Sequence, residues 1–233
     1  MKKFDSSTKT FLALVGFMIL IKFFDLIFDP NKIFPGRVAI FSWIEILIVL
    51  FFGGLGLICY KKIGLPKFWN EKFKTKKSVF SSIGLGLGFA LVFVLYDFVA
   101  RIGDISVGWP LSPVFYIWGA ISAEATYRLF AIGCFSWLFG NFILKKRYKV
   151  QVYWVFAIIF SGIAVFSMLS AFSIPEVPLV KPSMCLFVLL GGLVFVSEMV
   201  AFKLMKVYGF LSNLIFRLSF YSVWHVAWPI IIY

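Results

Sequence analysis

Long apolar segments follow one another along the chain, separated by short connections that hold most of its charged residues. The apolar runs are continuous over about 20 residues, the length that an α-helix needs to cross a bilayer core of about 30 Å. Transmembrane β-strands would instead alternate apolar and polar residues over about ten positions. The pattern therefore predicts about seven transmembrane helices. Their expected ranges are 10–28, 38–60, 78–100, 113–144, 150–172, 183–205 and 207–233.

The last of these segments can be interpreted in two ways. It can form one tilted helix from Val207 to Tyr233. Alternatively, a short amphipathic piece that bears Asn213 and Arg217 precedes a helix through Trp224 and His225. Both forms place the only histidine of the chain in the apolar part of the segment.

Composition supports an all-α, multi-pass membrane protein. Of the 233 residues, 62% are hydrophobic and only 14% are charged, and the mean hydropathy is +0.99. No connection is long enough for a soluble domain, so residues 1–233 are expected to form a single membrane domain. Cys59, Cys134 and Cys185 all fall inside predicted spans and show no paired spacing, which favours neither disulfides nor a metal site.

Lysine and arginine residues are concentrated in alternate connections. The N-terminus and the second, fourth and sixth connections carry most of them, whereas the first, third and fifth carry few. The positive-inside rule then predicts a cytoplasmic N-terminus. The net charge of +13 is explained by this topology and by attraction to anionic membrane lipids rather than by nucleic-acid binding. Abundant phenylalanine and lysine favour an AT-rich bacterial genome, and hence a bacterial plasma membrane.

Two opposite charges, Glu124 and Arg128, lie near the middle of the predicted span 113–144. Ionisable groups at bilayer depth cost several kcal/mol unless they face the protein interior and find partners, so they are candidates for a functional site. Residues four apart share a helix face, and an acid that precedes a base is the better orientation for a pair. We therefore expect both side chains to turn inward, either as a structural ion pair or as part of a site.

Other ionisable residues also fall within predicted spans. Lys22 and Asp25 are three residues apart and can pair locally. Asp97 and Glu198 are expected to reach polar surroundings from near the ends of their spans. Glu45 lies nearer the middle of its span and is a candidate cavity-lining acid.

The segment Ala123-Glu-Ala-Thr-Tyr-Arg128 resembles the first signature of the CPBP family, which comprises CAAX-type and bacteriocin-processing intramembrane endopeptidases. That signature reads E-E-x-x-x-R, often with an aromatic residue before the arginine; here Tyr127 supplies the aromatic residue. Phe166-Ser-Met-Leu-Ser170 resembles a later F-x-x-x-H motif, with serine in place of histidine. His225-Val-Ala-Trp-Pro229 resembles H-x-x-x-N, with proline in place of asparagine. The likeness covers a CPBP-like core over residues 113–233.

The resemblance implies a helical bundle around a polar cavity, in which the first glutamate and the second-motif histidine activate a water. In this chain those positions are Ala123 and Ser170, and neither can accept a proton near neutral pH. His225 remains from the group that the resemblance assigns to the oxyanion. Glu124 points about 100° around the helix from position 123 and cannot simply replace that glutamate. The resemblance therefore implies degenerate proteolytic machinery, supported by Arg128, Tyr127 and Ser170.

Three functions remain open. A peptide-binding, immunity or maturation factor would bind a membrane-embedded segment, or a prenylated or leader peptide, without efficient cleavage. A working endopeptidase would use Glu124 as the base and His225 as its partner, with Ser170 or Tyr127 as donors. A small transporter would line its path with Glu45, Glu124 and Arg128. None of these readings calls for a cofactor or a metal.

Overall fold

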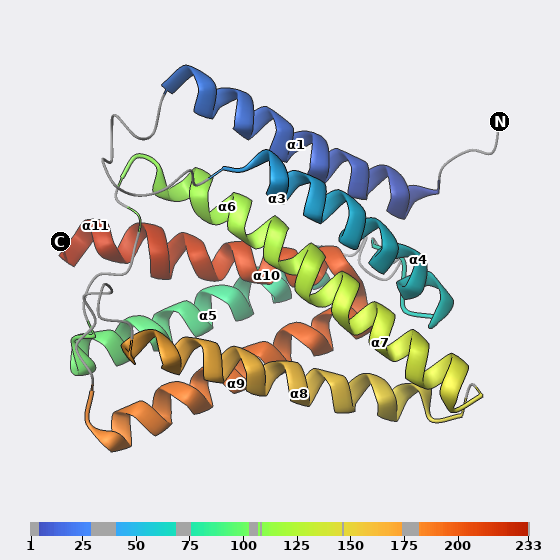
Figure 1. The fold of residues 1–233 in the computed structure, drawn as a ribbon. Coiled ribbons are helices and arrows are strands. Elements are labelled where there is room, and N and C mark those ends of the chain that lie inside the picture. Colours follow the sequence, from blue (N-terminus) through green and yellow to red (C-terminus); the bar gives the residue numbers. More distant parts are fainter. Residues whose placement is uncertain are drawn as a thin grey trace.

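A computed structural model of the chain describes residues 5–28, 41–68, 76–102, 107, 109–145, 147–173 and 182–232, although not the side chains of 24–28 and 76–78. These residues form seven helical rods without a strand, which lie roughly along a common direction (Figure 1). The all-α prediction is confirmed.

Four of the rods are α-helical over nearly their whole length. They are α1 (Ser6–Phe28), α5 (Lys76–Ala100), α8 (Lys149–Ser170), which ends in the short 3-10 turn η5 (Ala171–Ser173), and α9 (Met184–Tyr208).

The other three rods contain π-helical turns. The first consists of α3 (Trp43–Ile48), η1 (Val49–Gly53) and α4 (Gly54–Lys62). The second consists of α6 (Ser112–Ala123), η3 (Glu124–Ile132), α7 (Gly133–Trp137) and η4 (Leu138–Ile143). The third consists of α10 (Phe210–Tyr221), η6 (Ser222–Ala227) and α11 (Trp228–Ile232). The last rod is continuous, which corresponds to the first of the two forms expected for that segment.

Six of the rods are long and apolar enough to cross a membrane. The remaining rod, residues 112–143, holds Glu124 and Arg128. Large apolar side chains on the outside of the bundle are widely exposed, as in Leu95 (65%), Phe166 (74%) and Met184 (76%). A solvated surface would not carry so many such side chains, whereas acyl chains solvate them well. These features are those of an integral membrane protein.

Glycines allow two rods to approach the centre closely. A Cβ on Gly56 of α4 would lie 2.5 Å from the backbone N and Cα of Phe130 in η3. A Cβ on Gly86 of α5 would lie 2.5 Å from the carbonyl oxygen of Phe216 in α10. Small residues of this kind let transmembrane helices pack backbone against backbone, so η3 and α10 are held in the interior.

One end of the bundle gathers the start of α1, the end of α4 and the start of α8, on the side where the N-terminus lies (Figure 1). Two polar contacts join elements at this end: Lys61 of α4 pairs with Asp5, just before α1, at 2.7 Å, and the side chain of Asn141 in η4 donates to the Lys62 carbonyl at 2.9 Å. Lysines from several connections therefore share this end. The assignment of this end to the cytoplasm remains a prediction.

Candidate functional site

Four charged side chains from three rods meet in the interior of the bundle. Glu124 and Arg128 come from η3, Glu198 from α9 and Arg217 from α10. Arg128 binds both Glu124 and Glu198. Arg217 also binds both acids, through Nε to Glu124 at 3.1 Å and through Nη2 to Glu198 at 2.6 Å. Two acids and two bases therefore alternate in a closed group without net charge, called the charge cluster below.

Donors surround the carboxylate of Glu124. Oε1 accepts hydrogen bonds from Arg128 and from Arg217, and Oε2 accepts one from the Asn213 side chain. The residue is 1% exposed. A carboxylate with charge-assisted bonds to both oxygens is held as an acceptor, so neither oxygen is free to take a proton from water.

The charge cluster lies well inside the length of the rods that carry it. Glu124 is about 12 residues from the start of its rod at Ser112, and Arg217 is about 15 residues from the end of its rod at Ile232. At about 1.5 Å per residue, these separations correspond to about 18 and 23 Å along the helix axes. Both rod ends lie on the side of the C-terminus (Figure 1). A hydrocarbon core is about 30 Å thick. The four charges are therefore remote from the rod ends on that side, and because their side chains are at most 12% exposed they depend on one another for solvation.

The inward orientation of Glu124 and Arg128 is confirmed, since they are 1% and 2% exposed. The pair is not isolated, however, because the sequence interpretation missed both of its other partners. Glu198 was expected to reach polar surroundings near its span end, yet it is buried in the charge cluster. Arg217 was expected as part of the last segment, in one form on a short amphipathic piece, yet its side chain lies inside the bundle. One signal was present: Asn213 and Arg217 are four apart, as are Glu124 and Arg128.

His225 belongs to η6 and stacks on Tyr116 of α6, with ring centroids 4.3 Å apart and planes at 14°. Its Nδ1 is buried without a hydrogen-bond partner. The imidazole lines a cavity of about 190 Å³ together with Glu198 and Arg217. Glu124 does not line this cavity. A cavity with a charged edge therefore lies beside His225, and the acid that lines it is Glu198 rather than Glu124.

The remaining residues of this cavity are mostly apolar or aromatic, among them Phe93, Met168, Phe220 and Trp224. Charged groups thus occupy one side of a space with otherwise apolar walls. A polar ligand group could lie there beside Glu198 and Arg217, whereas its apolar part would contact the aromatic rings.

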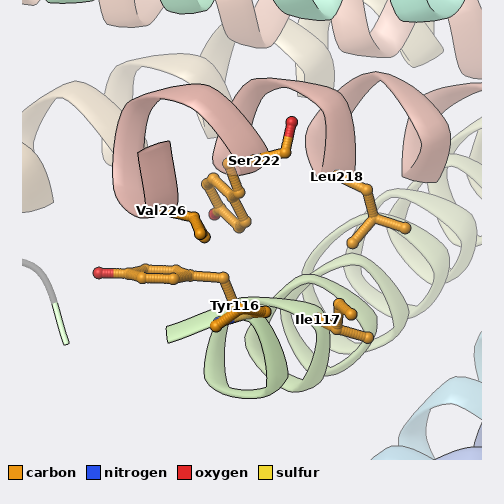
Figure 2. Close-up of a pocket in the computed structure, with 7 residues that line it drawn as sticks. Tyr116, Ile117, Leu218, Ser222 and Val226 are labelled. Atoms are coloured by element: carbon orange, nitrogen blue, oxygen red, sulfur yellow. The ribbon is translucent and has the colours of Figure 1, made fainter. Parts of the chain in front are cut away.

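A second cavity of about 280 Å³ lies between α6 and the α10–η6 rod. Figure 2 shows Tyr116 and Ile117 on one side and Leu218, Ser222 and Val226 on the other. Tyr221 lines both this cavity and the first. Tyr116, which stacks on His225, lines the second. Three aromatic rings therefore separate the apolar cavity from the partly charged one: those of Tyr116, Tyr221 and His225.

Other residues singled out in the sequence lie elsewhere. The Tyr127 hydroxyl donates to the Phe160 carbonyl at 2.5 Å, and the Ser170 hydroxyl donates to the carbonyl of Ser167 at 2.9 Å. Neither lines the cavity with His225. Glu45 accepts a hydrogen bond from the Trp118 indole at 2.7 Å.

Asp97 is also buried, contrary to expectation. It accepts hydrogen bonds from the Trp228 indole at 2.8 Å and from the backbone of Ile102 at 3.1 Å. The expected pairing of Lys22 with Asp25 lies outside the described residues, because the Asp25 side chain is among those not described.

Among the described residues, no group of three or more histidine, cysteine, aspartate and glutamate side chains could hold a metal ion. Comparisons with protein-family models, with curated proteins and with solved structures found no match for this chain. The class that fold and composition define is an all-α, multi-pass membrane protein, and a finer assignment rests on the chemistry of the site.

Proposed function

We propose that the chain is a membrane-embedded peptide-binding protein, similar in layout to the CPBP endopeptidases but without hydrolytic activity. The observation that carries this proposal is the occupation of both oxygens of Glu124 by Arg128, Arg217 and Asn213. Ala123 and Ser170 stand where the resemblance places the proton acceptors, and Glu124, the acid next to position 123, is bound at both oxygens. The charge cluster therefore acts as a clamp between η3, α9 and α10.

Glu198 is no better placed as a general base, although it shares a cavity with His225. Its Oε1 is bound by Arg217 and its Oε2 by Arg128. A general base needs a free acceptor within hydrogen-bond reach of the attacking water. Loss of either arginine would free an oxygen, but it would also leave an unpaired buried charge.

The two cavities support a peptide as the ligand. Volumes of about 190 and 280 Å³ fall below the range of about 300–1,000 Å³ usual for drug-sized molecules, and suit single side chains. An apolar side chain fits between Tyr116 and Leu218. A neighbouring polar side chain fits beside His225 and Arg217. A transmembrane segment with one polar residue in an apolar run supplies this combination.

Less supports the transport alternative. Glu45 is bonded to Trp118 and does not line the cavity that contains Glu198 and Arg217. Glu124 and Arg128 are bonded within the charge cluster. A path would have to break these ion pairs at each passage, at a cost of several kcal/mol.

Binding can be measured in lipid nanodiscs with labelled leucine-rich transmembrane peptides. One peptide carries a single central glutamine and its control carries leucine there. We expect saturable energy transfer to the purified protein, stronger for the glutamine peptide. Ser222→Trp, which fills the apolar cavity, should weaken binding at least tenfold. Ser167→Trp, at an exposed serine of α8 that lines neither cavity, is the matched control and should bind as the wild type does.

Equal binding of both peptides to the wild type and to Ser222→Trp would contradict the proposal. Concentrative uptake of a solute into proteoliposomes, abolished by Glu124→Gln, would instead establish the transporter.

A further inference from the structure

A third cavity, of about 210 Å³, lies at the lysine-rich end of the bundle, away from the charge cluster. Its wall combines the turn after α4 with the start of α8 and the end of α9: Pro66, Lys149, Tyr153 and Lys206 are among its residues. Two lysines from separate helices therefore face one cavity, which lies at the ends of these rods.

The two lysines carry charge that no described carboxylate neutralises. At the same end, Lys61 is paired with Asp5 at 2.7 Å. No ion pair within the described parts of the chain involves Lys149 or Lys206. Among the residues that the structure describes, the wall of this cavity contains no acid. Two half-buried ammonium groups beside one cavity repel each other unless an anion lies between them.

Packing holds one of these lysines in position. The Lys206 ammonium lies over the rings of Trp154 and Tyr153, at 4.7 and 5.6 Å from their centroids. A Cβ at Gly140 would contact the Cα and side chain of Lys149 at 3.6–3.8 Å, so η4 packs against the start of α8. Ordered cations lose less conformational entropy when they bind an anion.

The first turn of α8 adds backbone donors. The helix begins at Lys149, and the preceding residue, Tyr148, gives no side-chain cap. The first N–H groups of a helix have no partner within it and favour an anion. Val150 of this turn lines the same cavity. Two lysines and an uncapped helix start thus converge on one space.

We propose that this cavity binds a phosphate group, with a phospholipid headgroup as its source at the membrane surface. Basic pockets between transmembrane helices at a cytoplasmic surface recognise anionic headgroups in this way. Pro66 and Leu65 on the cavity wall give the glycerol and upper acyl carbons an apolar surface. This proposal does not depend on peptide binding, because none of these residues lines the other two cavities.

Thermal unfolding of the detergent-solubilised protein tests this site. Titration with phosphatidylglycerol should raise the melting temperature in a saturable way, whereas phosphatidylcholine should not. Lys149→Gln and Lys206→Gln should each raise the half-saturating phosphatidylglycerol concentration about fivefold, and Lys206→Arg should retain most of the effect. Lys145→Gln and Lys203→Gln remove the same charge from exposed neighbours outside the cavity wall and should respond as the wild type does.

Inorganic phosphate provides the second arm. Saturation by phosphate that both cavity variants weaken, without a lipid response, would support the anion site and identify a soluble ligand as its source. If the cavity variants and the control variants lose the anion-induced rise in melting temperature equally, the proposal is overturned, because the rise would then reflect overall charge. Absence of any response to either anion in the wild type would overturn it too. The melting temperature without lipid shows that each variant is folded.

Discussion

Removal of Arg128 should destabilise the protein strongly, because it leaves two buried acids with one base. Arg128→Met deletes the guanidinium that binds Glu124 and Glu198 and packs 4.8 Å from the centroid of the Phe202 ring. Loss of one member of a buried ion pair costs about 3–5 kcal/mol. Glu124→Gln leaves the opposite imbalance, with two arginines for Glu198, and should cost a similar amount.

The double variant separates charge balance from packing. In Arg128→Met with Glu124→Gln, the Glu198–Arg217 pair, 2.6 Å apart in the wild type, is again neutral. We expect its destabilisation to fall short of the sum of the single values by at least about 1 kcal/mol, within the range of coupling between contacting residues. Reversible unfolding in mixed detergent micelles, monitored by circular dichroism, gives the four free energies of the cycle.

Arg147→Met, at an exposed arginine in the turn before α8, is the control and should change stability by no more than about 0.5 kcal/mol. Two results would refute the reasoning: a cost for Arg128→Met below about 1 kcal/mol, or additive effects of Arg128→Met and Glu124→Gln. Either would mean that the four charges are not solvated by one another.

Two further predictions concern packing and pH. Gly56→Ala should lower the free energy of unfolding by about 1–3 kcal/mol, as overpacking does, because the added Cβ would lie 2.5 Å from the Phe130 backbone. Gly84→Ala, where a Cβ would have nothing within 4 Å, should be neutral or stabilising in the same unfolding assay. The hydrogen bond from Lys61 lowers the pKa of Asp5 from 3.8 to about 2. The contribution of this ion pair to folding stability is therefore present above pH 4 and is lost as the pH falls towards 2. Because both side chains are more than one third exposed, it amounts to no more than about 1 kcal/mol. Asp5→Asn should remove that part of the pH dependence, and an unchanged profile would contradict the assignment.

The number and ranges of the helical rods could be predicted from the sequence because each follows a long, largely apolar segment, although six of the seven, not all, are long and apolar enough to cross a membrane. The predicted span 78–100 became 76–100, and 113–144 became 112–143. In a membrane the backbone must satisfy its own hydrogen bonds, so length and hydropathy alone decide where a helix forms. The inward turn of Glu124 and Arg128 followed from the same argument.

The partners of that pair could not be predicted in the same way. Glu198 and Arg217 are brought to it by packing between rods, which hydropathy does not encode. Arg217 lies only about seven residues, or about 10 Å, from the start of its rod, where a basic residue is usually taken for a surface charge. Glu198 lies in the second half of its helix, where a glutamate can reach either water or the interior. Which it does depends on the neighbouring rods.

The π-helical turns were also not apparent from the sequence. The segment η3 contains Glu124 and Arg128, and η6 contains His225. Such turns occur frequently at functional sites. They change the rotation of the side chains that follow them, so a helical wheel drawn with α-helical spacing misplaces the neighbours of His225. Tyr116, from another rod, is the ring that stacks on it.

The central claim is that the acids of the charge cluster are bound to arginines and do not act as bases. The most direct test incubates the purified protein in nanodiscs with the glutamine-bearing transmembrane peptide and follows peptide mass over time. We predict that the peptide is bound and stays intact. Fragments produced by the wild type but not by Glu124→Ala, Glu198→Ala or His225→Ala would contradict the claim and establish a hydrolase.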